Sequence, residues 1–463
     1  MSESLYDELV RYASDGRTAF HMPGHKRKEA FGGLLPYSMD ITEIEGFDNL
    51  HDRRGILKSL SERMAKLWRA DYAFPLVGGS TCGILSAIYA LTSPGDTVLI
   101  DRNCHKSVYN AAELCSLSVR CVRGKTDVGF GFVMPPSASE IKKQLESSPG
   151  CKAVIITSPT YEGMIADVGA IAGVAASYGA RLIVDQAHGA HFGFDGNTGA
   201  SAVGVADAAI VSLHKTLPAM TQTAALFVSK NVDTGAIESG LSVFETSSPS
   251  YPLLASIDRC VSFLEENGGD AFLDYKALLD RFYSAMTALE NLRVCSCNNH
   301  DPGKIIVSCR GCDIDGNKMS EILRENFGIE IEMVAPDYVL AMSTVADSSD
   351  DLEKLADAIL AIDKSVRRSD KPESGYETDT GIPRKVFDAC ETRSMPGEYI
   401  DYHDAVGRVS HEYVYAYPPG APIIAAGELV DDKFTSKADR LLVSGVKVCS
   451  SRGKFPLIFV VKD

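Results

Sequence analysis

Short apolar runs alternate with helical stretches from about residue 58 to residue 229. The runs are rich in valine and isoleucine, are bounded by Gly, Pro, Asp or Ser, and read FPLVG, TVLID, SVRCV, KAVIIT, RLIVD, AAIVS and AALFVS. Strands that are apolar on both faces belong in a mostly parallel sheet with helices on both sides. The pattern therefore predicts a large α/β domain, to which we assign residues 58–255.

The pattern changes on both sides of this domain. Residues 1–57 are irregular and polar, which predicts an N-terminal arm or dimerisation segment. Residues 256–364 continue a long predicted helix and then alternate strand and helix patterns, as a smaller α+β domain would. Residues 365–385 are charged and nearly free of large aliphatic side chains, so we interpret them as a linker to a C-terminal domain at 386–463.

Composition narrows the class of protein. A chain of 463 residues has room for roughly two to four domains, and 45% hydrophobic residues is ordinary for a globular protein. The 62 acidic residues outnumber the 46 basic ones, and a net charge of −16 disfavours nucleic acid as a partner. No apolar run approaches the ~18 residues of a membrane helix, and the N-terminus is too acidic for a signal peptide. We expect a cytoplasmic protein without a membrane partner.

Twelve cysteines in so long a chain do not form a disulfide framework. One cluster has a C-x-C and a C-x-x-C pair that would suit zinc; it contains Cys295, Cys297, Cys309 and Cys312. C-x-C is poor spacing for a zinc knuckle, and the intervening residues read as a turn and a strand. We therefore expect a hairpin and no metal site here.

Polar side chains follow several predicted strands, at the edge of the sheet where ligands collect. After FPLVG, residues Gly79, Ser80 and Thr81 open a helix. The free N–H groups of a helix start, together with the two hydroxyls, would form a phosphate cradle. An ordinary helix N-cap is the other interpretation, since Ser and Thr are preferred there.

Asp185 ends the run RLIVD and is followed by Ala187 and His188. A carboxylate at the end of a buried strand needs a partner. It would serve as a metal ligand, as a general base, or as the partner of a protonated ring nitrogen. Metal is the weaker choice, because His188 and His191 lack the i, i+4 spacing of a helical zinc pair.

A lysine follows another buried run. The stretch DAAIVSLHK ends with Ser212, His214 and Lys215 before the chain turns at Pro218. Taken alone, a lysine at such a rim is usually a surface residue. Lys215 lies 30 residues after Asp185, however, and this interval holds one helix-and-strand unit. Both side chains can therefore reach the same crevice.

A phosphate cradle, a strand-end Asp and a strand-end Lys in this order are the groups that pyridoxal phosphate requires. Lys215 would hold the aldehyde as a Schiff base, and Asp185 would keep the pyridine nitrogen protonated. The phosphate would be held by Ser80, Thr81 and Ser212. His105 would cover the ring face, although a solvent-exposed histidine at a helix start is an equally good interpretation.

The chain resembles the fold-type I pyridoxal phosphate enzymes and, within them, the Orn/Lys/Arg decarboxylase family. The resemblance runs from about residue 18 to residue 430. It rests on a series of ordered motifs: HMPGHK (21–26), the acidic stretch around Glu43 and Asp48-Asn49-Leu50, Gly79-Ser80-Thr81, RNCHK (102–106), SPTYEG (158–163), DQAHGAH (185–191), SLHKT (212–216), TSSPSY (246–251), Glu412 and YPPG (417–420).

The resemblance implies both a fold and an activity. The fold would be the fold-type I transferase fold, a mostly parallel α/β sheet with helices on both faces, plus a smaller α+β domain and a C-terminal extension. The activity would be decarboxylation of a basic amino acid, a small-molecule substrate, with a place in polyamine biosynthesis. Family members form dimers with active sites at the subunit interface. A homodimer is therefore expected, and a higher oligomer stays open.

The resemblance also assigns roles by motif position. The catalytic residues would be Lys215, His214, His105 and Asp185. The cofactor would be bound by Gly79, Ser80, Thr81, His105, Asp185, Ala187, His188, Ser212, His214 and Lys215, with Ser247 and Ser248 reaching the neighbouring protomer's phosphate. Glu412 would pair with the distal cation of the substrate.

Two features distinguish this chain from the large members of the family. Its motifs begin at about Thr18, so we expect the receiver-like N-terminal domain of the large members to be absent. AHGAH follows the strand-end Asp, where the large members have bulkier residues. We therefore interpret the chain as a short form.

Other activities on the same scaffold stay open at this point. An aminotransferase or an α-oxoamine synthase is one alternative, and a catalytically silent cofactor-binding regulator is another, although Lys215, Asp185 and His105 are all in place. One methylene is worth only ~1–3 kcal/mol in a pocket, so the sequence does not decide between ornithine and lysine. Arginine is slightly preferred, because short members include arginine decarboxylases and a guanidinium suits Glu412.

Overall fold

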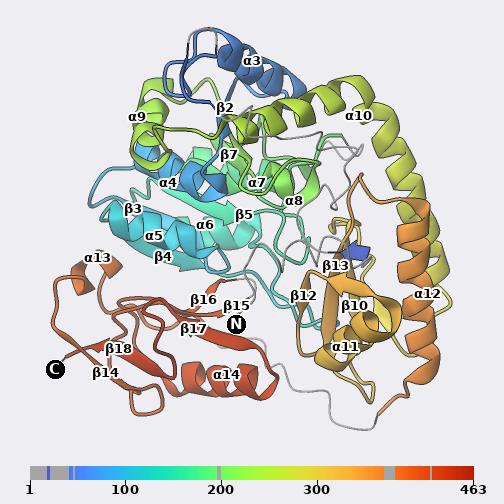
Figure 1. The fold of residues 1–463 in the computed structure, drawn as a ribbon. Coiled ribbons are helices and arrows are strands. Elements are labelled where there is room, and N and C mark those ends of the chain that lie inside the picture. The colour runs from blue at the N-terminus through green and yellow to red at the C-terminus, as the bar shows by residue number, and fades with distance from the viewer. Residues whose placement is uncertain are drawn as a thin grey trace, which may run out of the picture.

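The computed structural model describes residues 18–20, 41–44, 47–194, 200–369, 381–417 and 420–462. The HMPGHK motif and Pro418-Pro419 lie outside the described residues. Figure 1 shows a large domain around a central sheet, a small domain reached through the long helix α10 (Tyr251–Met286), and a C-terminal domain beside the large one.

A seven-stranded sheet forms the centre of the large domain, in the order β2-β8-β7-β6-β5-β3-β4. The strands are β2 (Tyr72–Leu76), β3 (Thr97–Asp101), β4 (Ser118–Val122), β5 (Ala153–Thr157), β6 (Arg181–Asp185), β7 (Ala208–Val211) and β8 (Ala224–Val228). All neighbours from β4 to β7 pair in parallel, and β8 runs antiparallel to both β2 and β7. The predicted mostly parallel α/β sheet is confirmed.

Helices cover both faces of this sheet because its strands are apolar on both sides. Val154 and Ile156 of β5 belong to one core, while Ala153 and Ile155 belong to the other, since successive side chains of a strand point to opposite faces. Residues of α3, α6, α7 and α10 line the first core, and residues of α4, α5 and α9 line the second. The helices are α3 (Ile56–Trp68), α4 (Gly79–Leu91), α5 (Lys106–Leu114), α6 (Ala138–Glu146), α7 (Val168–Ser177) and α9 (Thr234–Phe244).

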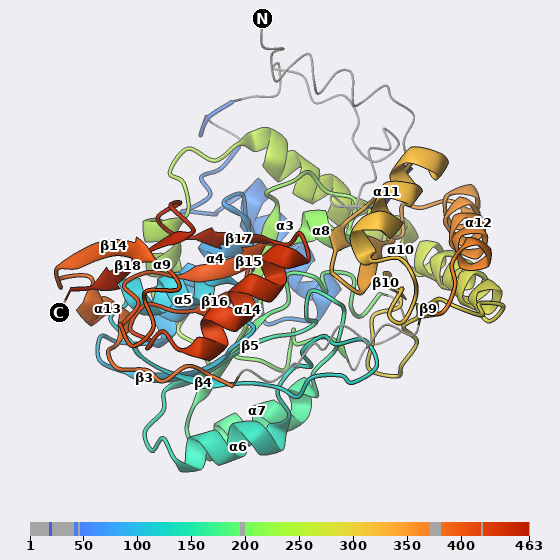
Figure 2. The same cartoon turned by 90° about the horizontal axis from the view of Figure 1, so that it is seen from below.

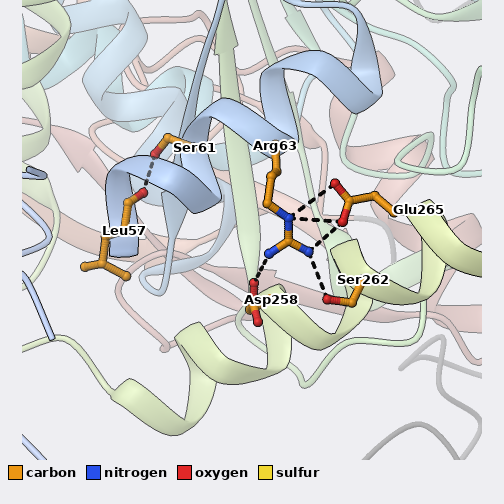
Figure 3. Close-up of polar contacts among 6 residues, drawn as sticks. All are labelled: Leu57, Ser61, Arg63, Asp258, Ser262 and Glu265. Atoms are coloured by element: carbon orange, nitrogen blue, oxygen red, sulfur yellow. Dashed lines mark hydrogen bonds and ion pairs between the residues drawn. The ribbon is translucent and has the colours of Figure 1, made fainter. Parts of the chain in front are cut away.

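The 36-residue helix α10 links the large domain to the small one (Figure 1). Pro252 stands in its first turn, where a missing N–H leaves no helical hydrogen bond unmade. Arg63 of α3 holds this helix in place. Its guanidinium donates to Glu265 at 2.6 Å, to Ser262 at 2.9 Å and to Asp258 at 2.5 Å (Figure 3). Three acceptors from successive turns thus fix α10 against the large domain.

The small domain contains an antiparallel sheet in the order β12-β13-β10-β9, with helices α11 and α12. Its elements are β9 (Arg293–Val294), β10 (Lys304–Ser308), α11 (Gly316–Phe327), β12 (Met333–Val334), β13 (Tyr338–Met342) and α12 (Ser349–Ser365). A separate parallel pair joins β1 (Thr18–Phe20) to β11 (Ile329–Ile331). Cys295 and Cys309 directly follow the paired strands β9 and β10. No group of three metal-ligating side chains suited to an ion occurs in the described parts of the chain.

The C-terminal domain has its own core and packs beside β4 and α5 (Figure 2). Its elements are α13 (Ala389–Thr392), β14 (Gly397–Asp401), β15 (Val414–Tyr417), β16 (Pro422–Ile424), α14 (Asp432–Val443), β17 (Lys447–Ser450) and β18 (Leu457–Val461). Arg102, directly after β3, forms a buried bidentate ion pair with Glu428, with contacts of 2.5 and 2.8 Å. Across the described residues, no helix is both long and apolar enough to cross a membrane.

We expect Glu428→Ala to destabilise the protein by about 3–5 kcal/mol, because it leaves the Arg102 guanidinium buried without its partner. Lys276→Ala is the control, since it removes only an exposed pair with Asp280 and should lower stability by less than about 1 kcal/mol. Urea unfolding followed by circular dichroism measures both changes. Equal losses in the two variants would contradict a structural role for the buried pair.

Candidate active site

The carboxyl ends of the central strands meet at one edge of the sheet. Asp185 is the last residue of β6, and Ser212 directly follows β7, the parallel neighbour of β6. Strand β2 runs in the same direction as β7, since both are antiparallel to β8. The turn at Gly79, which follows β2, therefore reaches the same edge. Groups that are far apart in the sequence are brought together in this way.

Lys215 lies in the short helix α8 (Leu213–Thr216), and its Nζ is 2.9 Å from Nε2 of His188. Burial lowers the pKa of Lys215, an effect that the negative charges of Asp185 and Glu332 partly offset. Asp185 is 5% exposed, and burial raises its pKa, while the Lys215 cation and the N–H of Ala187 oppose that rise. Asp185 and Lys215 are therefore electrostatic neighbours at this edge of the sheet.

His105 occupies the N-cap position of α5. Its Nδ1 accepts the N–H of Ser107 at 3.3 Å and lies 2.8 Å from the hydroxyl oxygen of the same residue. Burial, followed by the cations of Lys215 and Lys106, lowers the pKa of His105 to about 4. The ring is therefore uncharged at neutral pH, and the helix start fixes its orientation within electrostatic range of Lys215.

Glu245 fixes the turn between β2 and α4 through hydrogen bonds to its backbone. The carboxylate of Glu245 accepts the N–H groups of Val77 at 3.1 Å and Gly78 at 2.9 Å. A Cβ on Gly78 would lie only 3.0 Å from Glu245 Oε1, and Gly79 has a φ of +74°. Among the described residues no side chain caps α4, so the N–H groups of its first turn, including that of the half-buried Ser80, are available to an anion. Thr81 is exposed.

The Ser212 hydroxyl is fully buried and has no hydrogen-bond partner among the described residues. Thr216 Oγ1, four residues later on α8, is in the same state. Buried hydroxyls in folded proteins nearly always have partners, and an orphaned one calls for an explanation. An anion that accepts from Ser212 at this edge of the sheet would satisfy it.

His214, Ser247 and Ser248 are the remaining predicted cofactor residues. The Nδ1 of His214 is 2.9 Å from the carbonyl oxygen of Thr223, so this ring is tied to the start of β8. Ser247 and Ser248 are exposed in the loop between α9 and α10. Among the described residues, neither hydroxyl forms a hydrogen bond with Lys215, Asp185 or His188.

Glu412 lies inside the C-terminal domain. It is 2% exposed, and its two carboxylate oxygens accept backbone N–H groups from Phe459 at 2.7 Å and Arg452 at 2.9 Å. The Glu412 carboxylate therefore binds backbone N–H groups of its own domain. These contacts give no evidence for the expected pairing of Glu412 with a substrate cation, which stays a prediction.

Sequence reasoning missed two site residues, both from the small domain. Lys304, the first residue of β10, places its Nζ 2.7 Å from Nδ1 of His188. Glu332, between β11 and β12, accepts a hydrogen bond from Tyr161, whose ring centroid is 4.7 Å from that of His188. Lys304 begins an apolar run, KIIVS, and such a lysine is indistinguishable in sequence from a surface residue.

Comparison with known proteins places this geometry in a family. The model of the Orn/Lys/Arg decarboxylase major domain matches residues 3–300. The Bacillus subtilis protein YaaO is 31% identical over 96% of this chain and 95% of its own length, and the B. subtilis arginine decarboxylase is 29% identical over 96% and 94%. The structure of the Francisella novicida lysine decarboxylase LdcF has a TM-score of 0.78 at 16% identity, covering 98% of this chain and 80% of LdcF.

The fold and these matches define a pyridoxal phosphate enzyme of fold-type I. Because the family model covers more than half of the sequence, the chain belongs to the Orn/Lys/Arg decarboxylase family and is a pyridoxal-phosphate-dependent decarboxylase. The resemblance noted in the sequence is confirmed. The pocket fits this cofactor: the orphaned Ser212 hydroxyl and the uncapped start of α4 suit a phosphate, and the buried Asp185 suits a cationic ring nitrogen.

We expect Ser212→Ala to leave the cofactor-free protein as stable as before or slightly more stable, because the lost hydroxyl has no partner among the described residues. Ser158→Ala is the matched control. Its equally buried Oγ accepts the N–H of Ala166 at 3.1 Å, and its loss should destabilise the protein by about 1–3 kcal/mol.

Thermal unfolding without cofactor compares the two serine variants. When pyridoxal phosphate is titrated in, Ser212→Ala should bind it about tenfold more weakly, as expected for one lost hydrogen bond to a charged group. An unchanged affinity would remove Ser212 from the phosphate site.

Proposed function

We propose that the protein decarboxylates a basic amino acid, with arginine as the preferred substrate, and releases the amine and CO₂. The observation that carries this proposal is the pocket in which Lys215, Asp185 and His188 lie together at the carboxyl edge of the sheet. Arginine is favoured because relatives that align over nearly the whole chain, from B. subtilis and Bacillus anthracis, are arginine decarboxylases. The acidic net charge also favours a cationic substrate.

Lys215 is the proposed amine that bonds to the aldehyde carbon of the cofactor. A lysine has to lose its proton before it can act as a nucleophile, and burial in this pocket favours the neutral form. Asp185 is the proposed partner of the pyridine nitrogen. When bound, pyridoxal phosphate supplies a ring that stabilises the electron pair left on Cα as CO₂ departs. A negative Asp185 keeps such a ring protonated.

The other site residues have supporting roles in this proposal. His105 covers one face of the ring as an uncharged plane, and Ala187 and His188 line the pocket after β6. The phosphate is bound by Gly79, Ser80, Thr81 and Ser212. His214 and Lys215 are the two candidate proton donors to Cα. The contact of His214 Nδ1 with a carbonyl oxygen fixes the neutral tautomer with the proton on Nδ1, so Nε2 has to be protonated before it can donate.

The test of the reaction supplies arginine, lysine and ornithine to the cofactor-loaded enzyme and measures CO₂ and amine. We expect agmatine from arginine with the highest kcat/KM. Lys215→Ala should lose the visible absorbance of the lysine-bound cofactor and nearly all turnover. Lys354→Ala, which changes a lysine of α12 that donates to Thr18 and the Gly328 carbonyl, should keep both.

Formation of a keto acid in place of CO₂ would instead favour an aminotransferase. Wild-type protein that stays colourless when pyridoxal phosphate is supplied would refute the proposed role of Lys215. Turnover of lysine or ornithine ahead of arginine would keep the reaction class and change the substrate.

We further propose a homodimer in which Ser247 and Ser248 reach the phosphate site of the neighbouring protomer. Both side chains are exposed in the described chain, at the loop that leads into α10. Two exposed hydroxyls before a long, firmly held helix suit a contact made between subunits. Thr246 lies in the same loop, and its carbonyl oxygen accepts a hydrogen bond from the His51 ring. This bond anchors the loop to the N-terminal side of the large domain.

Ser248→Asp should weaken cofactor binding, because it places a carboxylate against the partner's phosphate. Mixed with Lys215→Ala and allowed to exchange subunits, this inactive variant should regain activity, since one site of each mixed dimer then has both Lys215 and Ser248. A mixture of Lys215→Ala with Asp185→Ala is the control and should stay inactive. Sedimentation equilibrium gives the mass of the assembly, and a monomer would contradict the proposal.

A further inference from the structure

His188 lies between two lysine side chains that come from different domains. Its Nε2 is 2.9 Å from Nζ of Lys215 at the edge of the large-domain sheet. Its Nδ1 is 2.7 Å from Nζ of Lys304, which begins β10 in the small domain. His188 is 5% exposed and Lys304 is 1% exposed. The roles proposed for the other site residues leave Lys304 unused.

Counting donors and acceptors shows that the two lysines cannot both be charged. A neutral imidazole has one N–H and one lone pair, and an ammonium group has donors only. Burial, together with the cations of Lys215 and Lys304, places the pKa of His188 well below its usual range, so the ring is neutral. Both contacts are therefore hydrogen bonds only if at least one lysine is an amine that accepts the ring N–H, while the other lysine donates to the ring lone pair as an ammonium or an amine.

The surroundings of Lys304 allow it to hold or lose a proton near neutral pH. Burial lowers the pKa of Lys304 to about 7, while the carboxylates of Asp301, Glu332 and Glu162 oppose the decrease. The ammonium also faces the ring of Tyr161, 5.3 Å from its centroid. The titratable, charged or polarisable groups around Lys304, His188 and Lys215 are Asp185, Glu162, Glu332, Asp301, His105, His214, His300, Tyr161 and Met342.

We propose that Lys304 is a positioning residue that acts through His188 to hold the proton which Lys215 gives up on becoming an amine. This inference rests on the proposed role of Lys215. In the first arrangement, the Lys304 ammonium donates to Nδ1 and the Nε2–H donates to neutral Lys215. In the second, one proton has passed from Lys304 to Nδ1 and another from Nε2 to Lys215. The total charge and the number of protons are the same in both.

The two arrangements explain why a small-domain lysine is buried at a large-domain site. A cation at Nδ1 forces the ring proton onto Nε2, and this proton in turn needs a neutral Lys215 as its acceptor. Without Lys304, Nε2 is free to accept from a Lys215 ammonium, and the amine form loses its advantage. The small domain thereby controls the charge of the amine that the large domain presents.

The test measures how fast the full-length, cofactor-free protein captures pyridoxal phosphate, followed by the absorbance of the lysine-bound cofactor at a series of pH values. With Lys304→Met, the pKa of Lys215 should rise and its ammonium form should persist to higher pH. We expect capture at pH 7 to slow roughly tenfold and the pH–rate profile to move up by about one unit. Lys304→Arg keeps a permanent cation beside Nδ1 and should return the profile toward that of the wild type.

Lys354→Met is the matched control, because it removes a half-buried lysine of the same domain that contacts only Thr18 and the Gly328 carbonyl in the described chain. Its profile should match the wild type. A Lys304→Met profile that superimposes on the wild-type profile, or a Lys304→Arg variant that behaves like Lys304→Met, would overturn the inference. Wild-type protein that captures no pyridoxal phosphate would instead refute the proposed function, so the two failures are distinct.

A measurement on the unmodified chain decides the matter if the Lys304 variants do not fold. Nitrogen NMR of ¹⁵N-histidine-labelled, full-length protein reports which ring nitrogens carry protons, and the His188 signals are those lost in His188→Gln. We expect a neutral ring with its proton on Nε2 below the pH at which Lys304 titrates. A doubly protonated ring in that range would contradict the proposed chain of hydrogen bonds. A ring protonated only on Nδ1 would place the cation on Lys215 instead of Lys304 and would also overturn the inference.

Discussion

Burying the Lys215 amine at the carboxyl edge of the central sheet is the constraint on which the rest of the site depends. A charged amine is unstable away from water unless opposite charges or hydrogen-bond acceptors surround it. Asp185 and Glu332 favour the ammonium form, whereas burial favours the amine. Under the proposed function, the amine form of Lys215 is the one that bonds to the cofactor aldehyde.

The protonation of Lys215 depends on how the central sheet, helix α10 and the small domain are held together. The sheet sets the separation of Asp185 and Lys215, because β6 and β7 are adjacent parallel strands. Helix α10, fixed to α3 through Arg63, carries the chain to the small domain (Figure 1). From that domain, Lys304 contacts His188, and the charge of Glu332 acts on Lys215. The site is therefore shared between two domains, and its electrostatics depend on their relative position.

The proposed phosphate site at the start of α4 depends on backbone N–H groups. Glu245 occupies the N–H groups that precede α4, which fixes the turn and leaves the first N–H groups of the helix for an anion. The orphaned Ser212 hydroxyl marks the same edge from β7. In the proposed function, backbone N–H groups and hydroxyls bind the cofactor phosphate in a protein whose net charge is −16.

Local pattern determined most of the fold and half of the site. The seven apolar runs form the seven strands of the central sheet, since strand formation and burial depend on residues that are adjacent in sequence. The positions of Asp185 at the end of β6 and of Ser212 and Lys215 just after β7 could be predicted because strand ends are also local features. Only the tertiary structure shows the surroundings of Lys304 and Glu412. In sequence, Lys304 resembles a surface lysine, but it is buried because the small domain packs against His188. Glu412 resembles a free carboxylate, but its oxygens accept hydrogen bonds from the backbone N–H groups of Phe459 and Arg452. These contacts join segments that are far apart in the sequence and form when domains pack together. The spacing of hydrophobic residues along the chain therefore does not predict them.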